Sequence, residues 1–280
     1  MTTVGLATWE GLPGLSADDQ RLLAPLRDRG LQPVPVVWSE SAPDAARLDL
    51  VVVRSTWDYH HRLAEFLAWI DRVGGRTRLW NPPATVRWNS DKRYLQELAR
   101  RGVATIPTVW SSEFESVTRT LRDRGWDRGV LKPTVSASGY ATELVRVDSP
   151  EANERTLTRL RTRGELMLQP FVDATLGPGE RSLVFLAGRY SHAILRAPKF
   201  ADRSTIGEGQ AHQPSEVERR FADAVLATLK PVPLYARVDL VPLDDGPHLM
   251  ELELVEPELY FRAGPGSAER LADAIAAQLS

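Results

Sequence analysis

The sequence contains no cysteine, which excludes disulfide bonds, thiolate catalysis and cysteine-ligated zinc. It also has no run of 18 apolar residues of the kind that forms a membrane-spanning helix. The formal net charge of −2 gives no electrostatic reason to expect nucleic acid or a membrane surface as a partner. The first fifteen letters, MTTVGLATWEGLPGL, lack the basic segment and apolar core of a signal peptide. These absences predict a soluble, cytoplasmic protein.

Several catalytic signatures are missing too. The GxSxG, HExxH and GxGxxG patterns of serine hydrolases, zinc proteases and dinucleotide enzymes do not occur. At 280 residues, of which 42% are hydrophobic, the chain can bury a large core divided among two or three domains.

A β-hairpin is predicted over residues 236–258, with strong turn chemistry at residues 244–247. Successive side chains of a strand point to opposite faces. The expected buried face consists of Val238, Leu240, Met250, Leu252 and Leu254. The other face consists of Arg237, Asp239, Glu251 and Glu253, with Asp239 roughly opposite Glu251.

Three carboxylates on one small patch have two interpretations. They can form the solvated face of an ordinary antiparallel sheet. Alternatively, they hold Mg²⁺, because three like charges repel one another unless a cation neutralises them and Mg²⁺ prefers oxygen ligands. The second interpretation requires a phosphate-bearing ligand elsewhere in the chain.

Short apolar runs at residues 3–8, 33–38 and 50–54 alternate with helical patterns near 17–30 and 61–73, which predicts βαβ units and a mostly parallel sheet. The polar and aromatic residues 55–59 follow the third run, at the strand end where ligands bind in such sheets. This segment is either a substrate contact or a capped helix start. The adjacent His60 and His61 diverge on a helix and are not expected to ligate one metal.

The middle of the chain contains two conspicuous lysines. Residues 81–83 (NPP) are expected to be a linker, followed by a helix capped by Asn89 or Ser90 and running to about Arg101. Lys92 lies in its first turn, where the helix dipole disfavours a cation; it is either functional or simply solvated. Lys132 lies in a strand over residues 129–133, and the small residues 136–142 follow it. They are either simple turn formers or a loop whose N–H groups approach an anion.

Further elements are predicted along the rest of the sequence. A capping box at residues 112–115 predicts a helix start. Strands are expected at 143–147, 165–172, 182–187 and 190–196, and helices at 215–229 and 267–279.

The order of these parts resembles the ATP-grasp fold over nearly the whole chain. A helix lysine, a strand lysine with a small-residue loop, then QPFV (169–172), GER (179–181), RVD (237–239) and ELE (251–253) occur in the order typical of the family. The segments STWDY, NPP, RWNSDKRYL and ELELVEPE are similar to the O-ureidoserine cyclo-ligases of D-cycloserine biosynthesis, within the glutathione synthetase and RimK-like branch.

The resemblance implies an α/β protein with three parts. An N-terminal pre-ATP-grasp domain with a parallel sheet is expected over residues 1–87, a small central lid domain over 88–172 and a C-terminal antiparallel-sheet domain over 173–280.

The resemblance also implies roles for individual residues. Nucleotide binding is implied for Lys92, Lys132, Ser136, Ser138, Gly139, Gln169, Phe171, Val172 and Glu180. Asp239, Glu251 and Glu253 are implied to hold two Mg²⁺ ions, although many relatives have asparagine where Glu253 stands. Arg237, Lys132 and Arg196 are implied to assist the chemistry, and substrate contacts are expected from Asp58, Tyr59, Arg196, Glu256 and Glu258.

The implied activity is that of an ATP- and Mg²⁺-dependent ligase. It would convert the carboxylate of a small amino-acid-like substrate into an acyl phosphate, which a nitrogen atom then attacks. In a cyclo-ligase this nitrogen belongs to the same substrate. A linear amide or peptide ligase, another phosphotransferase on the same scaffold and a non-catalytic ATP-binding module are the alternatives, and a homodimer stays open.

Overall fold

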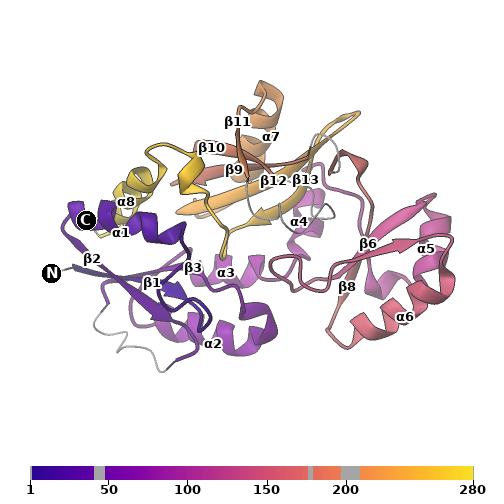
Figure 1. Ribbon diagram of the computed structural model, residues 1–280, viewed down its shortest axis with the longest axis horizontal. Coiled ribbons are helices and arrows are strands. Elements are labelled where there is room, and N and C mark those ends of the chain that lie inside the picture. The colour runs from indigo at the N-terminus through magenta and orange to yellow at the C-terminus, as the bar shows by residue number, and fades with distance from the viewer. Residues whose placement is uncertain (1, 41–47, 176–178, 197–208, 280) are drawn as a thin grey trace.

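The computed structural model describes residues 2–40, 48–175, 179–196 and 209–279. Three sheets form its framework, and a helical layer covers each of them (Figure 1). No helix within the described ranges is both long and apolar enough to cross a membrane.

The N-terminal sheet is parallel throughout and has the strand order β2-β1-β3-β4. Its strands are β1 (Thr2–Thr8), β2 (Leu31–Val37), β3 (Leu50–Ser55) and β4 (Arg78–Trp80). The helical elements that follow in the chain are η1 (Asp19–Leu22), α1 (Leu23–Asp28), η3 (Tyr59–His61), α2 (Leu63–Gly74) and α3 (Pro83–Asn89). The expected βαβ pattern is therefore present.

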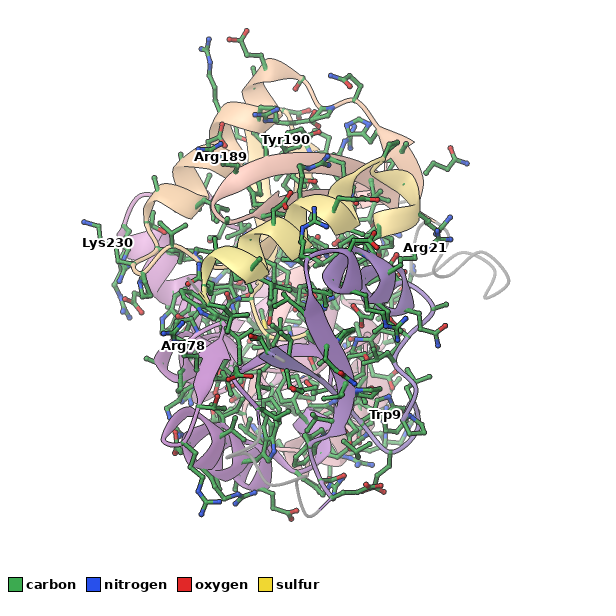
Figure 2. The ribbon with its side chains drawn as sticks, turned by 90° about the vertical axis from the view of Figure 1, so that its left-hand side faces the viewer. Trp9, Arg21, Arg78, Arg189, Tyr190 and Lys230 are labelled. Atoms are coloured by element: carbon green, nitrogen blue, oxygen red, sulfur yellow. The ribbon has the colours of Figure 1, made fainter. Side chains whose placement is uncertain are left out.

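Both faces of this sheet are covered, which explains why β3 reads as a continuous apolar run. Leu50 and Val52 point to one face and pack in the core cluster that contains Leu26 and Ile275. Val51 and Val53 point to the other face, where α2 packs. Helix α8 (Ser267–Ala277), at the far end of the chain, lies beside α1 on the first face (Figure 2).

The central sheet is antiparallel, with the strand order β5-β8-β6-β7. Its strands are β5 (Val109–Trp110), β6 (Arg128–Pro133), β7 (Glu143–Arg146) and β8 (Leu166–Pro170). Its helical elements are η4 (Ser111–Glu113), α5 (Val117–Asp123), α6 (Pro150–Arg161) and η5 (Asp173–Thr175). The residues 136–142 connect β6 to β7 and are called the lid loop below.

The C-terminal sheet is antiparallel, with the strand order β11-β10-β9-β12-β13. Its strands are β9 (Glu180–Leu186), β10 (Arg189–Arg196), β11 (Gln210–His212), β12 (Tyr235–Leu243) and β13 (Gly246–Glu253). The helical elements of this part are α4 (Tyr94–Arg100), α7 (Glu216–Ala227) and η7 (Phe261–Ala263). One apolar cluster joins α4 and α7 to this sheet. The division at residues 87 and 172 stays a prediction.

Three local predictions were wrong. Residues 81–83 are not simply a linker, because Pro83 begins α3. The helix expected from Asn89 or Ser90 is interrupted: α3 ends at Asn89, and α4 begins only at Tyr94. The capping box at residues 112–115 does not start α5, since Ser116 caps it by accepting a hydrogen bond from the Arg119 N–H. The strands β4, β5 and β11 and the helices α3 and α6 were not predicted at all.

Two asparagines explain the first two differences, because their side chains bind the backbone of the C-terminal sheet rather than capping a helix. Asn89 donates to the Leu252 carbonyl at 2.8 Å and accepts from the Leu254 N–H at 2.7 Å. Asn81 donates to the Tyr235 and Leu254 carbonyls at 3.0 and 2.7 Å and accepts from the Leu234 N–H at 2.8 Å. Both therefore join the chain around α3 to the hairpin β12–β13.

We expect Asn81→Ala to lower the free energy of unfolding by about 3 kcal/mol, because it leaves three buried backbone groups without partners. Urea denaturation followed by circular dichroism measures this difference. Gln20→Ala is the control, since it removes only hydrogen bonds near the surface and should cost less than about 0.5 kcal/mol. Equal effects of the two substitutions would contradict the expectation.

Candidate functional site

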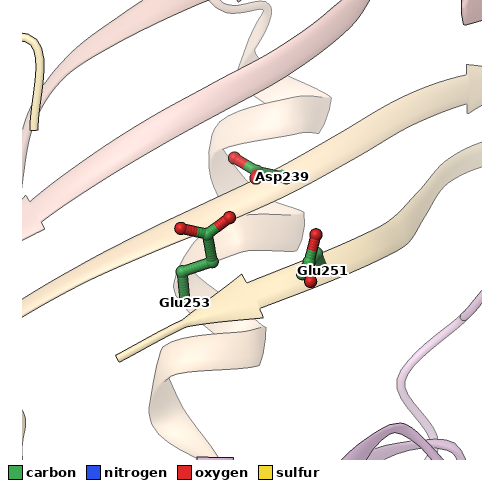
Figure 3. Close-up of side chains that lie close together, drawn as sticks. All are labelled: Asp239, Glu251 and Glu253. Atoms are coloured by element: carbon green, nitrogen blue, oxygen red, sulfur yellow. The ribbon is translucent and has the colours of Figure 1, made fainter. Parts of the chain in front are cut away.

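The hairpin β12–β13 brings the three predicted carboxylates together. Asp239 pairs with Glu251 across the two strands, as predicted, and Arg237 pairs with Glu253. Carboxylate oxygens of Asp239, Glu251 and Glu253 lie within 4.8 Å of one another (Figure 3). Such a set of hard oxygen donors fits a magnesium ion.

One detail of the hairpin differs from the prediction. The register shifts between Asp239 and Leu240, so that Leu240 pairs with Leu249 and Met250 becomes the extra residue of a β-bulge. Leu249 is fully buried, whereas Met250 is only partly buried. Simple alternation along the strand could not predict this change of phase.

Asp239 is the fixed centre of the carboxylate group. It is fully buried, and Arg237 binds it through Nε–Oδ1 and Nη2–Oδ2 contacts of 2.9 Å each. Ser182 donates to Oδ1 at 2.6 Å, and Arg196 lies 3.2 Å from Oδ2. Burial alone would raise the pKa of Asp239, but the two guanidinium groups and these hydrogen bonds lower it. Asp239 is therefore ionised.

Glu253 behaves differently, although Arg237 also contacts it. Burial, and then the negative charges of Asp239 and Glu251, raise its pKa to about 7 against the opposing effect of Arg237. Any further cation that binds beside Glu253 would favour its ionised form.

Lys92 connects the third carboxylate to the lid loop. Its Nζ lies 2.9 Å from Glu251 Oε1 and donates to the Ser136 carbonyl at 2.6 Å and to Ser136 Oγ at 3.2 Å. Burial favours the neutral amine, yet the charge of Glu251 outweighs it and raises the pKa of Lys92. The lysine is therefore a buried cation and not a solvated surface group.

A cavity of about 250 Å³ opens beside these groups and receives side chains from the central and C-terminal sheets and from the segment that follows β3. Most of the predicted site residues line it: Tyr59, Lys92, Lys132, Ser136, Ser138, Gly139, Arg196, Arg237, Glu251, Glu253, Glu256 and Glu258. Trp57, Asn89, Tyr94 and Tyr260 also line it.

Of these four, Trp57 belongs to the polar and aromatic segment 55–59 already singled out in the sequence, whereas the other three were missed. Asn89 looked like a helix cap, and Tyr94 looked like an ordinary helix residue. Tyr260 adopts a left-handed conformation with φ of 51°, which nothing in the sequence indicates.

Six predicted residues do not line this cavity, and one of them is Asp239, which is fully buried. Asp58 turns away from it and accepts hydrogen bonds from Trp38 Nε1 at 2.7 Å and Arg62 Nη2 at 3.0 Å. A direct substrate contact from Asp58 is therefore not supported by the geometry. Glu180 pairs with Arg196 at 3.0 Å.

The other three, Gln169, Phe171 and Val172, lie at and beyond the end of β8. Gln169 donates to Thr108 Oγ1 at 3.0 Å. The Phe171 N–H donates to the Arg128 carbonyl at 2.9 Å, and the Val172 carbonyl accepts from the Thr175 N–H at 3.0 Å.

The segment 254–259, which follows β13, fixes two more carboxylates at the cavity. Val255 and Leu259 are buried on one side, while Glu256 and Glu258 face the cavity on the other. A side chain from elsewhere binds each of the six successive carbonyls. The donors, in order from residue 254 to residue 259, are Asn81, Tyr235, Trp57, Arg54, Arg237 and His192.

Neither carboxylate of this segment has a hydrogen bond or an ion pair with any residue of the described ranges. Burial, followed by the charges of Glu253 and Glu251, raises the pKa of Glu256 to about 8 despite Lys92. Burial and the charge of Asp18 raise the pKa of Glu258 as well. Both groups would gain from a cationic ligand.

Comparison with known proteins agrees with this geometry. The family model of the N-terminal domain of D-cycloserine synthetase DcsG matches residues 4–81. The cycloserine biosynthesis protein DcsG of Streptomyces lavendulae is 35% identical over 276 residues, covering 92% of this chain and 92% of that protein.

Solved structures give the same result. The crystal structure of D-cycloserine synthetase DcsG has a TM-score of 0.90 at 33% identity, covering 99% of this chain and 100% of that one. A RimK domain ATP-grasp protein from Sphaerobacter thermophilus has a TM-score of 0.73 at 19% identity, covering 98% and 99%. D-alanine–D-alanine ligase from Bacillus anthracis complexed with ATP has a TM-score of 0.70 at 18% identity, covering 100% and 97%. The predicted ATP-grasp fold is confirmed.

The Glu256 carboxyl makes stability depend on pH. Its pKa is about 8 in the folded protein and near 4.5 when exposed, so between these values the folded state holds a proton that the unfolded state has lost. The contribution of Glu256 to the free energy of unfolding therefore decreases as the pH rises from 4.5 to 8. We expect Glu256→Gln to raise the melting temperature most at pH 8 and progressively less towards pH 5, measured calorimetrically in EDTA without nucleotide. An increase in melting temperature that is the same at every pH would contradict the raised pKa of Glu256.

Proposed function

The chain belongs to the family of D-cycloserine synthetase DcsG, and from this premise we propose that it closes an amino-acid-like substrate into a ring by forming a carbon–nitrogen bond. It is an ATP-grasp ligase and uses ATP. O-ureido-D-serine, which would give D-cycloserine, is the proposed substrate, and the cytoplasm is the proposed location.

One observation supports this proposal above all others: two lysines and two carboxylates from different elements face a single cavity, and an oxygen of a third, buried carboxylate lies within 4.8 Å of oxygens of the other two. Asp239, Glu251 and Glu253 come from the hairpin, Lys132 comes from β6, and Lys92 precedes α4. A non-catalytic ATP-binding module would not need this complete set of charges. Phosphoryl transfer needs these charges, because its catalysis consists mainly of positioning the reactants and stabilising negative charge.

We assign the nucleotide to the side of the cavity between the central and C-terminal sheets. Lys92 and Lys132 would contact its phosphates, and Ser136, Ser138 and Gly139 would cover them. Gln169, Phe171 and Val172 would border the adenine. Because the Val172 carbonyl already accepts from Thr175, the Val172 N–H is the expected hinge donor. Glu180 would bind the ribose hydroxyls.

The carboxylate group would hold magnesium, as two ions in our proposal. When bound, magnesium neutralises charge on the phosphate oxygens. Arg237 keeps Asp239 and Glu253 at fixed positions through its own contacts, so the oxygen ligands are oriented before any ligand arrives.

The proposed reaction has two steps. An oxygen of the substrate carboxylate first attacks the γ-phosphorus of ATP, and the bond from that phosphorus to the bridging oxygen breaks to release ADP. A nitrogen of the same substrate then attacks the acyl carbon, phosphate leaves with the electrons of the carbon–oxygen bond, and the nitrogen loses a proton. Arg237 and Lys132 would stabilise the negative charge on the transferred phosphoryl group.

Substrate selection would depend on charges at the far end of the cavity. Glu256 and Glu258 have no partners among the described residues and would bind the α-ammonium group of the substrate. Arg196 lines the same cavity and would contact its carboxylate, while Tyr59 borders the ligand. This arrangement favours a zwitterionic amino acid over a simple carboxylic acid.

The function is tested by Mg²⁺-dependent ADP release with O-ureidoserine of both hands, its analogue without the α-amino group, and other amino acids. We expect turnover with the D-form and a cyclic product seen by mass spectrometry. ADP release only after a second amine is added would instead indicate a linear ligase. ADP release without any nitrogen nucleophile would indicate a phosphotransferase.

We expect Glu251→Gln and Lys132→Ala each to reduce kcat by roughly 10²–10³-fold, because each removes a charge that stabilises the phosphoryl group during transfer. Steady-state ADP release measures the effect. Asp245→Asn is the matched control on the same hairpin, where its side chain is 77% exposed at the turn, and it should retain normal turnover. Unchanged turnover in both site variants would refute the site assignment.

A further inference from the structure

The lid loop is packed against the N-terminal domain, although it belongs to the central sheet. Ala137 is 8% exposed and lies in the core cluster that contains Val53, Tyr59 and Phe66. Val135, just before the loop, packs against the same cluster. The loop therefore spans two domains and covers the cavity between them.

A second contact lies near the tip of the loop, at Tyr140. The rings of His60 and His61 both lie 4.8 Å from the Tyr140 ring, centroid to centroid, and 4.0 Å from each other. On the central-domain side, Arg163 Nη1 donates to the Tyr140 hydroxyl at 2.5 Å. Tyr140 is thus held between the histidine pair of the N-terminal domain and an arginine of its own domain.

His60 has no evident role other than this contact. Neither of its ring nitrogens has a hydrogen bond of ordinary geometry in the described part of the chain. Burial, and then the neighbouring His61, lower its pKa to about 4 against a small opposing effect of the Trp57 backbone. The ring is therefore neutral near pH 7 and offers a flat aromatic surface.

The backbone on either side of Tyr140 adopts a conformation that needs external support. Ser138, Gly139 and Ala141 have φ values of 51°, 73° and 53°, in the left-handed region. Serine and alanine are disfavoured there, and such conformations persist only where the surroundings hold them. The docked Tyr140 ring and the buried Ala137 supply that support.

We propose that Tyr140 and His60 are positioning residues that keep the lid loop docked on the N-terminal domain while the acyl phosphate exists. This inference rests on the proposed function. An acyl phosphate that meets water is hydrolysed to carboxylate and inorganic phosphate, so that ATP is consumed without a ring being formed. A docked lid keeps the intermediate away from water until the substrate nitrogen attacks.

The first experiment measures ADP formed per ring product with O-ureido-D-serine. The wild-type ratio should be close to one, and in His60→Ala and Tyr140→Leu it should rise at least twofold. The double variant should be no worse than the single variants, since the two residues form one contact. His60→Phe and Tyr140→Phe keep the rings and should stay near the wild-type ratio. A ratio near one in both ring-removing variants would overturn the proposal.

The second experiment does not depend on the substrate. Chymotrypsin cleaves after tyrosine, so undocking of the lid should expose the bond after Tyr140. With Mg²⁺ and a non-hydrolysable ATP analogue, His60→Ala should be cleaved there several-fold faster than the wild type, although the substitution lies outside the loop. His248→Ala, at the hairpin β12–β13, is the matched control and should be cleaved at the wild-type rate.

These two readouts separate the inference from the function on which it rests. Faster cleavage in His60→Ala together with no turnover on O-ureido-D-serine would retain the lid contact and reject the substrate. Normal turnover with unchanged cleavage and an unchanged ADP ratio would retain the function and reject the contact. Thermal unfolding of each variant identifies any general loss of structure.

Discussion

The site depends on how the backbone of residues 254–259 is held. This segment leaves the sheet after β13, so its carbonyl groups have no neighbouring strand to accept from. Side chains of other elements supply the six donors, including Asn81 and Trp57 from the N-terminal half and His192 from β10. The cost of leaving these carbonyls unpaired therefore couples the N-terminal and C-terminal parts of the chain, and it fixes Glu256 and Glu258 without using their side chains.

The ion pairs at the site are of two kinds: those that hold a carboxylate in a fixed position, and one whose cation can move to a bound ligand. Arginines bind the fixed carboxylates through planar, bidentate geometry, as Arg237 does with Asp239. The exchangeable contact is that of Lys92, whose ammonium group binds Glu251 and the lid-loop carbonyl of Ser136. An ammonium is a compact point charge and can move to a phosphate with little change of geometry. The chain has only four lysines, and two of them line the cavity.

The sequence predicted those parts of the site that depend on local periodicity. Alternation along two strands was sufficient to place Asp239 opposite Glu251, and the order of motifs was sufficient for the fold. It could not predict the bulge at Met250, because a bulge depends on packing of the whole sheet. Asn89 had the sequence signature of a helix cap, yet its side chain binds β13, a partner 163 residues away in the chain. Tertiary contacts decided both cases.

The same reasoning explains why His60 and Tyr140 could not be connected from the sequence. His60 follows a strand of the N-terminal sheet, whereas Tyr140 lies in the lid loop between β6 and β7, and neither segment carries a signal that points to the other. Their contact arises only because the lid loop crosses from one domain to another. A loop that must open for ligands cannot be held by a large buried interface. A few aromatic contacts of about 1 kcal/mol each are of the right size for a lid that closes and opens in every cycle.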